Sequence, residues 1–262
     1  MKKLKKLTAL LLCITLMLSV APIVSAEIST TIDSDFIINQ PASDSFDQSV
    51  SEPYIISELT EKRTENTKHF LMSDRTVMAA VYDKAVHYKN GDSWENIDNS
   101  FSEVENGSEF ENKSNNLKTK FSKKSNSNKL VTVKKDNYTL SWSLNNSEKV
   151  NAVTNQSDDS SSDDISVLKN IVGAVTYTEI QDNVDLQYVV TGGDIKENIV
   201  LKNENAPLEY EFTYKFNKLS YRKNSENQIE LFDPSNEDDV CFIIDKPYMY
   251  DSNREYSDDV EI

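Results

Sequence analysis

The sequence predicts an all-β protein with one or two antiparallel β-sandwich-like units after a removable N-terminal segment. Apolar and polar residues alternate over several short stretches, most clearly from Leu208 to Phe216. A period of two is typical of a strand with one buried face. After residue 26 we find no amphipathic pattern of about ten or more residues that would indicate a helix. Many short strands at such spacing are typical of sandwiches.

Residues 1–26 have the parts of a secretory signal peptide. Lysines precede an apolar stretch at 7–20, and small residues lead to an expected cleavage after Ala26. The apolar stretch is shorter than the roughly 20 residues of a membrane span. Cleavage would remove Cys13 and leave Cys241 as the only thiol, so no intramolecular disulfide is expected. We therefore expect a secreted protein that keeps no membrane anchor.

The chain is strongly acidic, with a formal net charge of −16 at pH 7. The signal peptide contains lysines but no acidic residue, so the mature chain would be more acidic still. A nucleic acid or an anionic lipid surface would be repelled by this charge. The five glycines form neither GxGxxG nor GxxxxGK. These observations argue against nucleic acid, membrane and nucleotide as partners.

Changes in composition divide the chain into successive segments. The signal peptide at 1–26 is followed by a polar, flexible lead-in at 27–57 and a first β unit at 58–150. An acidic Ser/Asp linker at 151–164 leads to a second β unit at 165–262. Whether the two units form one body stays open. An apolar alternation that begins at the end of the sequence suggests continuation into a longer parent protein.

The polar stretch 99–128 is rich in Asn, Ser and Lys, and we expect either a long excursion there or a weak strand around 117–121. Clearer strands are expected at 77–82, 85–89, 130–133, 138–144, 184–190, 195–201 and 208–216. Two hairpin turns are expected at Asn90-Gly91 and at Gly192-Gly193. The first has the signature of a type I′ turn, which needs positive φ at both central residues.

A search for catalytic chemistry finds no GxSxG, HExxH or CxxC motif. His69 and His87 lack ligand-spaced partners, and a turn centred on Asn90-Gly91 would place His87 opposite Trp94. Cys241 has acidic neighbours and is interpreted as a small buried apolar residue. We expect no catalytic residue, no cofactor and no enzyme activity.

Clustered acids offer the oxygen ligands that Ca²⁺ prefers, and the weak candidates are Asp233, Glu237, Asp238 and Asp239. They do not match an EF-hand loop, so solvated acidic turns are the preferred interpretation. Trp94 and Trp142 could stack on a glycan, but both lie on alternating faces that a sandwich would bury.

Four stretches then resemble the N-terminal region of large secreted wall-associated proteins of Gram-positive bacteria. They are EKRTENTK at 61–68, VHYKNGDSW at 86–94, GDIKENIVL at 193–201 and PYMYD at 247–251. Those proteins carry DNRLRE-type β-domains and, further on, YD (Rhs) repeats. The resemblance implies an extracellular, non-catalytic module that anchors, presents or spaces a longer surface protein, and it carries over no catalytic residues.

We therefore expect a cell-surface scaffold whose partners are a cell-wall polymer or surface glycan and the other domains of a longer parent chain. One alternative is a carbohydrate-binding module that reads cell-wall or host glycans. The other is a secreted glycoside hydrolase, which would need two carboxylates facing each other across a cleft.

The strand register can be tested at Phe212, in the middle of the clearest alternation. Phe212→Ala should lower the free energy of unfolding by about 3 kcal/mol if this face is core. Chemical denaturation of both proteins measures the difference. A loss below about 0.5 kcal/mol would mean that Phe212 faces solvent and that the predicted register is wrong.

Overall fold

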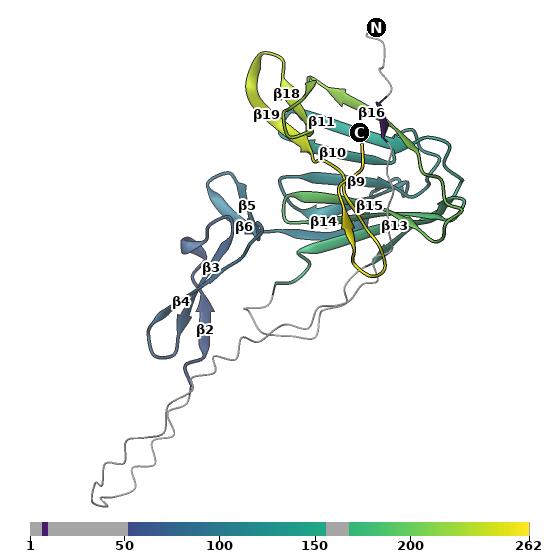
Figure 1. Cartoon of the computed structure of the whole chain (residues 1–262). Helices are drawn as coiled ribbons and strands as arrows, with labels where there is room; N and C mark the ends of the chain where they lie inside the picture. The colour runs from purple at the N-terminus through teal and green to yellow at the C-terminus, as the bar shows by residue number, and fades with distance from the viewer. Residues whose placement is uncertain (1–6, 10–51, 156–167, 262) are drawn as a thin grey trace, which may run out of the picture.

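The computed structural model describes residues 7–9, 52–155 and 168–261, and its only helical element among them is a 3₁₀ turn at Thr60–Lys62. The all-β prediction is confirmed. Figure 1 shows the larger sheets gathered into one body, from which the strands nearest the N-terminal end of 52–155 project to one side. The predicted strands outside 99–128 are found to within two residues at each end.

The largest sheet has seven strands in the order β1-β16-β11-β10-β9-β8-β7, all antiparallel to their neighbours. In that order they are Leu7–Ala9, Tyr210–Asn217, Tyr138–Leu144, Val131–Lys135, Lys118–Ser122, Glu109–Ser114 and Asp98–Glu103. β16 and β11 come from opposite sides of the expected linker, and they pair with Leu144 opposite Phe212.

A four-stranded sheet packs against the first, in the order β12-β13-β14-β15. Its strands are Ala152–Asn155, Val172–Gln181, Val184–Thr191 and Asp194–Leu201. Buried side chains from both sheets form one hydrophobic cluster, which includes Phe121, Val131, Trp142 and Phe212 from the first sheet and Val175, Tyr177, Leu186 and Tyr188 from the second. Strands from both expected β units therefore share one sandwich core, which answers the question that the sequence left open.

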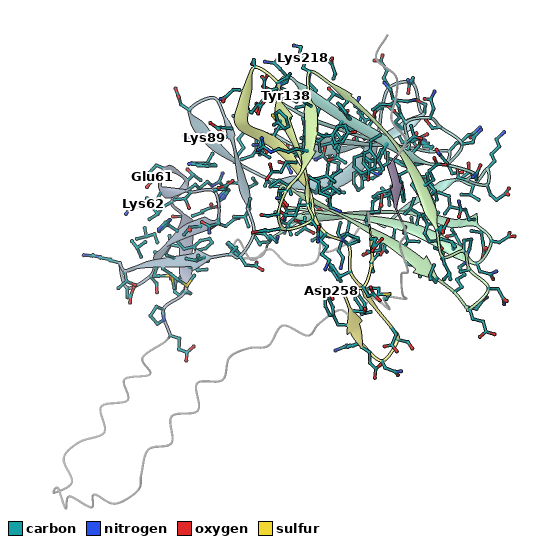
Figure 2. All side chains as sticks on the ribbon, turned by 45° about the horizontal axis from the view of Figure 1, so that its top comes forward. Glu61, Lys62, Lys89, Tyr138, Lys218 and Asp258 are labelled. Carbon is teal, nitrogen blue, oxygen red and sulfur yellow. The ribbon has the colours of Figure 1, made fainter. Side chains whose placement is uncertain are left out.

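Smaller antiparallel sheets complete the described fold. Toward the N-terminus lie β2-β3-β4 (Ile55–Glu58, Thr67–Met72, Val77–Val81) and β5-β6 (His87–Asn90, Ser93–Asn96). Toward the C-terminus lie β17-β18-β19 (Ser220–Lys223, Ile229–Asp233, Asn236–Ile244) and β20-β21 (Met249–Tyr250, Tyr256–Ser257). The Tyr138 hydroxyl of β11 donates to Asp233 Oδ2 of β18 at 2.5 Å. Figure 2 shows Tyr138 beside the β18–β19 hairpin that this bond ties to the large sheet.

Several expected segments begin or end elsewhere. β2 begins inside the expected lead-in at 27–57, and β12 occupies residues that were expected to be linker. β1 lies within the expected signal peptide. The rest of that peptide, including the Ala26 cleavage site, falls outside the described residues together with 27–51 and the acidic run at 156–167.

The weak strand expected around 117–121 is found as β9, whereas the alternative of a long excursion over 99–128 is wrong, because β7 and β8 also lie there. Three asparagines of this stretch, Asn99, Asn112 and Asn115, are buried and hydrogen-bonded. Asn99 Nδ2 donates to the carbonyl oxygens of Ile171 (3.0 Å) and Gly192 (3.1 Å), and its Oδ1 accepts from Asn112 and Asn115. Asn115 Nδ2 also donates to the Gly192 carbonyl at 2.7 Å. This network, the asparagine network, joins the large sheet to the four-stranded sheet.

The two sheets also approach closely at Gly173 of β13. A Cβ at this position would lie 2.0 Å from the Asn99 carbonyl oxygen and 2.7 Å from the Phe101 ring. Such a contact is far below a van der Waals separation, so any side chain here would push the sheets apart.

The first hairpin turn lies one residue later than expected. Asn90 pairs with Ser93, so the loop is Gly91-Asp92, and Lys89 lies opposite Trp94. Of the residues in this hairpin only Gly91 has positive φ, at 62°, whereas Asn90 stays in the strand and its amide donates to Glu95 Oε1. Glycine at the first central position is the type II′ arrangement.

At the second turn, Thr191 pairs with Asp194 across the loop Gly192-Gly193, with Gly192 at φ 57°. A Cβ on Gly192 would lie 2.9 Å from the Ala85 carbonyl oxygen. The turn is therefore pressed against the segment that leads into β5.

A charged cluster organises the N-terminal sheets, within and beside the EKRTENTK stretch. Arg63 binds both carboxylate oxygens of Glu58, at 2.7 and 3.1 Å, and the amine of Lys68 lies 3.8 Å from the same carboxylate. His87 is buried, and its Nδ1 lies 2.6 Å from the Thr64 carbonyl oxygen, which can only accept. Burial lowers the pKa of His87, so the ring is neutral with its proton on Nδ1. Arg63 and Lys68 of the EKRTENTK stretch therefore take part in contacts that hold the N-terminal sheets together.

The asparagine network makes a stability prediction. Asn99→Ala would leave the Ile171 carbonyl without its side-chain donor and remove the Asn99 donor from Gly192, so we expect a loss of about 3 kcal/mol in the free energy of unfolding. Asn116→Ala, at a neighbouring exposed position, should change it by no more than about 0.5 kcal/mol. Chemical denaturation measures both, and equal effects would contradict the assigned role.

Candidate functional site

A pocket of about 980 Å³ opens beside β15, the free edge of the four-stranded sheet. β10, β11 and β16 of the large sheet form one wall, and residues 194–198 of β15 form the opposite wall. β19 and the segment 245–250 close a third side. The pocket exists because the large sheet extends beyond the edge of the smaller one, and the C-terminal strands cover the remainder only in part.

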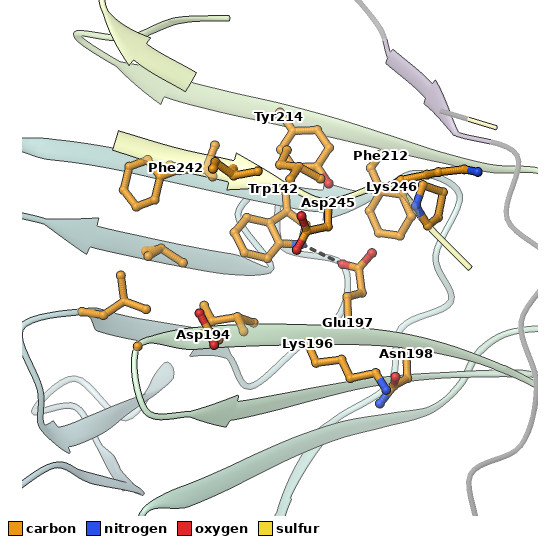
Figure 3. A pocket seen from close by; sticks show the side chains of 18 of the residues that line it. Trp142, Asp194, Lys196, Glu197, Asn198, Phe212, Tyr214, Phe242, Asp245 and Lys246 are labelled. Carbon is orange, nitrogen blue, oxygen red and sulfur yellow. Dashed lines mark hydrogen bonds between the residues drawn. The ribbon is translucent and has the colours of Figure 1, made fainter. Parts of the chain in front are cut away.

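Glu197 projects into this pocket from a position that the strand pattern reserves for core residues. On β15 it shares a face with Ile195 and Ile199, of which Ile199 is fully buried. Across the sheet it pairs with Tyr188, which is also fully buried. Figure 3 shows the carboxylate between Trp142 and Phe212, while Lys196 and Asn198 point away.

Two neutral donors hold the Glu197 carboxylate. Trp142 Nε1 donates to Oε2 at 2.9 Å, and the same N–H lies 3.2 Å from the Tyr188 hydroxyl. Burial raises the pKa of Glu197, and hydrogen bonds from Tyr188 and Trp142 only partly oppose this shift. Among the described residues no Lys, Arg or His forms an ion pair with Glu197. The site therefore holds a carboxylate that no protein cation neutralises.

The surroundings of the carboxylate are aromatic. The Trp142 and Tyr214 rings stack with centroids 5.9 Å apart and planes at 24°. Phe212, Phe242 and Tyr250 also line the pocket. A small number of polar groups in an aromatic-lined concave site is typical of small-molecule binding sites.

Most other charged groups at the pocket are already engaged. Lys84 forms an ion pair with Asp194 at 2.6 Å, and Lys246 pairs with Asp258 at 2.8 Å. The amine of Lys196 lies over the Tyr248 and Tyr250 rings, 5.5 and 5.7 Å from their centroids. Asp245 Oδ1 accepts from the Gln228 amide at 2.6 Å, and Lys135 lies at the exposed end of β10.

The structure does not bring the two tryptophans together, because Trp94 lies on β6 and Trp142 on β11. Trp94 is half-buried, and the amine of Lys89 lies 5.2 Å from its ring centroid. Trp142 is only 7% exposed, and Tyr214 stacks on its ring. Neither indole stands as an open stacking surface.

The weak Ca²⁺ candidates lie at the β18–β19 hairpin. Asp233 Oδ1 accepts from Ser235, and Oδ2 accepts from Tyr138. Within residues 52–155 and 168–261, no group of three or more His, Cys, Asp or Glu side chains is placed to hold a metal ion. Glu237, Asp238 and Asp239 are exposed on β19. Cys241, on the same strand, lines the pocket and is partly buried, and burial raises the pKa of its thiol.

Sequence reasoning missed Glu197. The signal was present in the order Ile195, Glu197, Ile199, where a charged residue interrupts an apolar alternation. Composition hides it, because the chain has 44 acidic residues.

The fold and pocket define a multi-sheet, antiparallel β protein with a partly covered sandwich edge. Comparison with known proteins shows which sequences the chain resembles. The chain is 25% identical over 210 residues to the "Wall-associated protein" of Geobacillus stearothermophilus, a match that covers 78% of this chain and 79% of that one. It is 27% identical over 207 residues to "tRNA nuclease WapA" of Bacillus subtilis (strain 168), covering 78% of this chain but 8% of that protein. No family model and no solved structure matches.

These matches support the predicted resemblance to wall-associated proteins at the level of weak homology, and the DNRLRE and YD-repeat assignments stay predictions. The chain spans only 8% of the length of the nucleases that it matches. In the described part of the chain, no helix has the length and apolar character that a membrane crossing requires.

The raised pKa of Glu197 predicts how pH affects stability. An unfolded Glu loses its proton near pH 4.5, whereas folded Glu197 keeps its proton to higher pH. As pH rises from 4.5 through the folded pKa, the unfolded state binds fewer protons than the folded state, so Glu197 lowers stability at pH 7 relative to pH 4. Glu197→Gln should therefore raise Tm at pH 7 and leave it nearly unchanged at pH 4. Each kcal/mol gained in the free energy of unfolding corresponds to a rise in Tm of roughly 2–4 °C in a chain of this size.

Glu209→Gln, at an exposed position, is the matched control and should change Tm little at either pH. Calorimetry of the three proteins at both pH values measures the difference. A lower Tm for Glu197→Gln at pH 7 would contradict the assigned cost of the buried charge.

Proposed function

We propose that the mature chain is a non-catalytic, cell-wall-associated β module that forms the N-terminal scaffold or anchoring segment of a larger surface protein. The observation that carries the proposal is the match to the Geobacillus wall-associated protein, which spans most of both chains. A secreted location follows from the predicted signal peptide at 1–26. The acidic charge would keep an exposed module soluble.

The hydrolase alternative needs a second carboxylate that faces Glu197 and is free to act. The other carboxylates that line the pocket are Asp194 and Asp245, and each is held by a partner at 2.6 Å. The nuclease activity in the names of the WapA relatives belongs to proteins of which the match covers 8%. We therefore favour a binding or spacing role over catalysis.

The carbohydrate-binding alternative needs an aromatic ring with an open face. Two tryptophans were expected to supply this ring. Tyr214 stacks on Trp142, and the amine of Lys89 lies over the ring of Trp94. Binding to a cell-wall polymer would then use a broader polar surface.

A sedimentation assay tests wall association. The mature chain, residues 27–262, is mixed with purified cell walls, with walls stripped of their anionic polymers, and with a soluble glycan panel, each with and without EDTA. We expect retention on walls and no release of soluble fragments. Loss of retention in EDTA would assign Ca²⁺ to the acidic turns. Failure to sediment with either wall preparation would refute wall binding, and fragment release would refute the non-catalytic role.

A further inference from the structure

The pocket beside β15 contains a carboxylate without a protein counterion, independent of any wall association. Glu197 Oε2 accepts from Trp142 Nε1, and Tyr188 also bonds to this carboxylate. Both donors are neutral, and no ion pair among the described residues includes Glu197. Glu197 lines the pocket, and Figure 3 shows its carboxylate between Trp142 and Phe212, where a ligand could meet it.

The charge of this carboxylate selects the chemistry of that ligand. A carboxylate in apolar surroundings is costly unless a donor or a cation satisfies it. The lysines at the pocket do not do so. Lys84 and Lys246 pair with Asp194 and Asp258, and Lys196 points away toward Tyr248 and Tyr250. Lys135 lies at the exposed end of β10 and forms no ion pair with Glu197. A protonated amine would supply the missing positive charge, whereas an anionic group would be repelled.

The walls favour the same ligand class. Trp142, Phe212 and Tyr214 surround the carboxylate, and aromatic rings attract ammonium groups through their electron-rich faces. They also offer apolar contact to the hydrocarbon next to the amine. The volume, about 980 Å³, is of the size found for small-molecule sites. The open side of the pocket would let a longer molecule extend past β15.

We propose that this pocket is a binding site for an organic ammonium group, with the amine paired to the Glu197 carboxylate and its alkyl chain against Trp142, Phe212 and Tyr214. The amine belongs either to a small free molecule or to a lysine side chain of a peptide. Both present the same group to Glu197, and they differ in what lies outside the pocket.

Calorimetric titration of the mature chain tests the proposal. The probes are 1-aminopentane for a free amine and Nα-acetyl-L-lysine methylamide for a peptide side chain. Their uncharged counterparts are 1-pentanol and Nα-acetyl-L-norleucine methylamide. We expect at least one amine to bind roughly tenfold or more tightly than its counterpart, since a hydrogen bond to a charged group is worth that factor. The better of the two amines identifies the source.

Glu197→Gln should weaken amine binding roughly ten- to a hundredfold, to the level of the uncharged probe. The Gln carbonyl can still accept from Trp142, so the pocket keeps its shape. Glu209→Gln removes the same charge from an exposed position and should leave binding unchanged.

Equal binding of amine and uncharged probe, or no binding of either amine up to about 10 mM, would overturn the proposal, as would full retention of binding in Glu197→Gln. If that variant fails to fold, the comparison of charged and uncharged probes on the wild-type chain still decides. Binding of an amine without wall sedimentation would support the pocket and refute wall association, so the two proposals can fail separately.

Discussion

The arrangement of the two large sheets depends on the hydrogen bonds that Asn99 and Asn115 make to the Gly192 carbonyl. These bonds cross from the large sheet to the turn between β14 and β15. A single neutral hydrogen bond contributes only about 1 kcal/mol, but a buried carbonyl without a donor costs about 1–3 kcal/mol. The asparagine network therefore acts mainly by making other alignments of the two sheets unfavourable, since these would leave the buried carbonyl without a donor. Gly173 allows the sheets to approach in the same region, because no side chain separates β13 from Asn99.

The position of the pocket follows from that alignment. Once the β14–β15 turn is held at Gly192, β15 lies as the free edge of a sheet that is narrower than its partner. The large sheet must then be covered by something else, and β19 with the segment 245–250 covers it incompletely. Glu197 occupies a core-facing position of β15 at this edge. A carboxylate is tolerated there because Trp142 and Tyr188 bond to it and because it lines the partly open pocket.

The same physical features bear on function. The N-terminal charged cluster of Glu58, Arg63 and Lys68 stabilises small sheets that could hold little apolar core, so the conspicuous charged stretch EKRTENTK serves the fold. The weak homology to a wall-associated protein covers 78% of the chain and is therefore not confined to one short stretch. The pocket is the place where the described structure offers specific chemistry to a small ligand. A wall-associated module with a selective amine site would combine both properties.

The sequence by itself determined those strands in which apolar and polar residues alternate along the chain. Apolar and polar residues alternate along β11 and β16, so the period of two identifies their apolar face, although Ser141 and Ser143 on the other face of β11 are also buried. β7 and β8 escaped prediction, because Asn99, Asn112 and Asn115 are polar residues whose hydrogen-bond network extends to the distant Gly192 carbonyl. Only the tertiary structure could show that burying them leaves no unpaired amide.

The turn at Gly91 and the role of Glu197 were decided in the same way. Asn90-Gly91 satisfies the local rule for a type I′ turn, yet Asn90 remains in β5, where its side chain binds Glu95. Glu197 is one acid among many in the sequence, and it becomes distinctive only where β15 turns that position toward Trp142. Local periodicity specifies which residues lie on one face of a strand. What that face meets is set by packing between strands that are far apart in the chain.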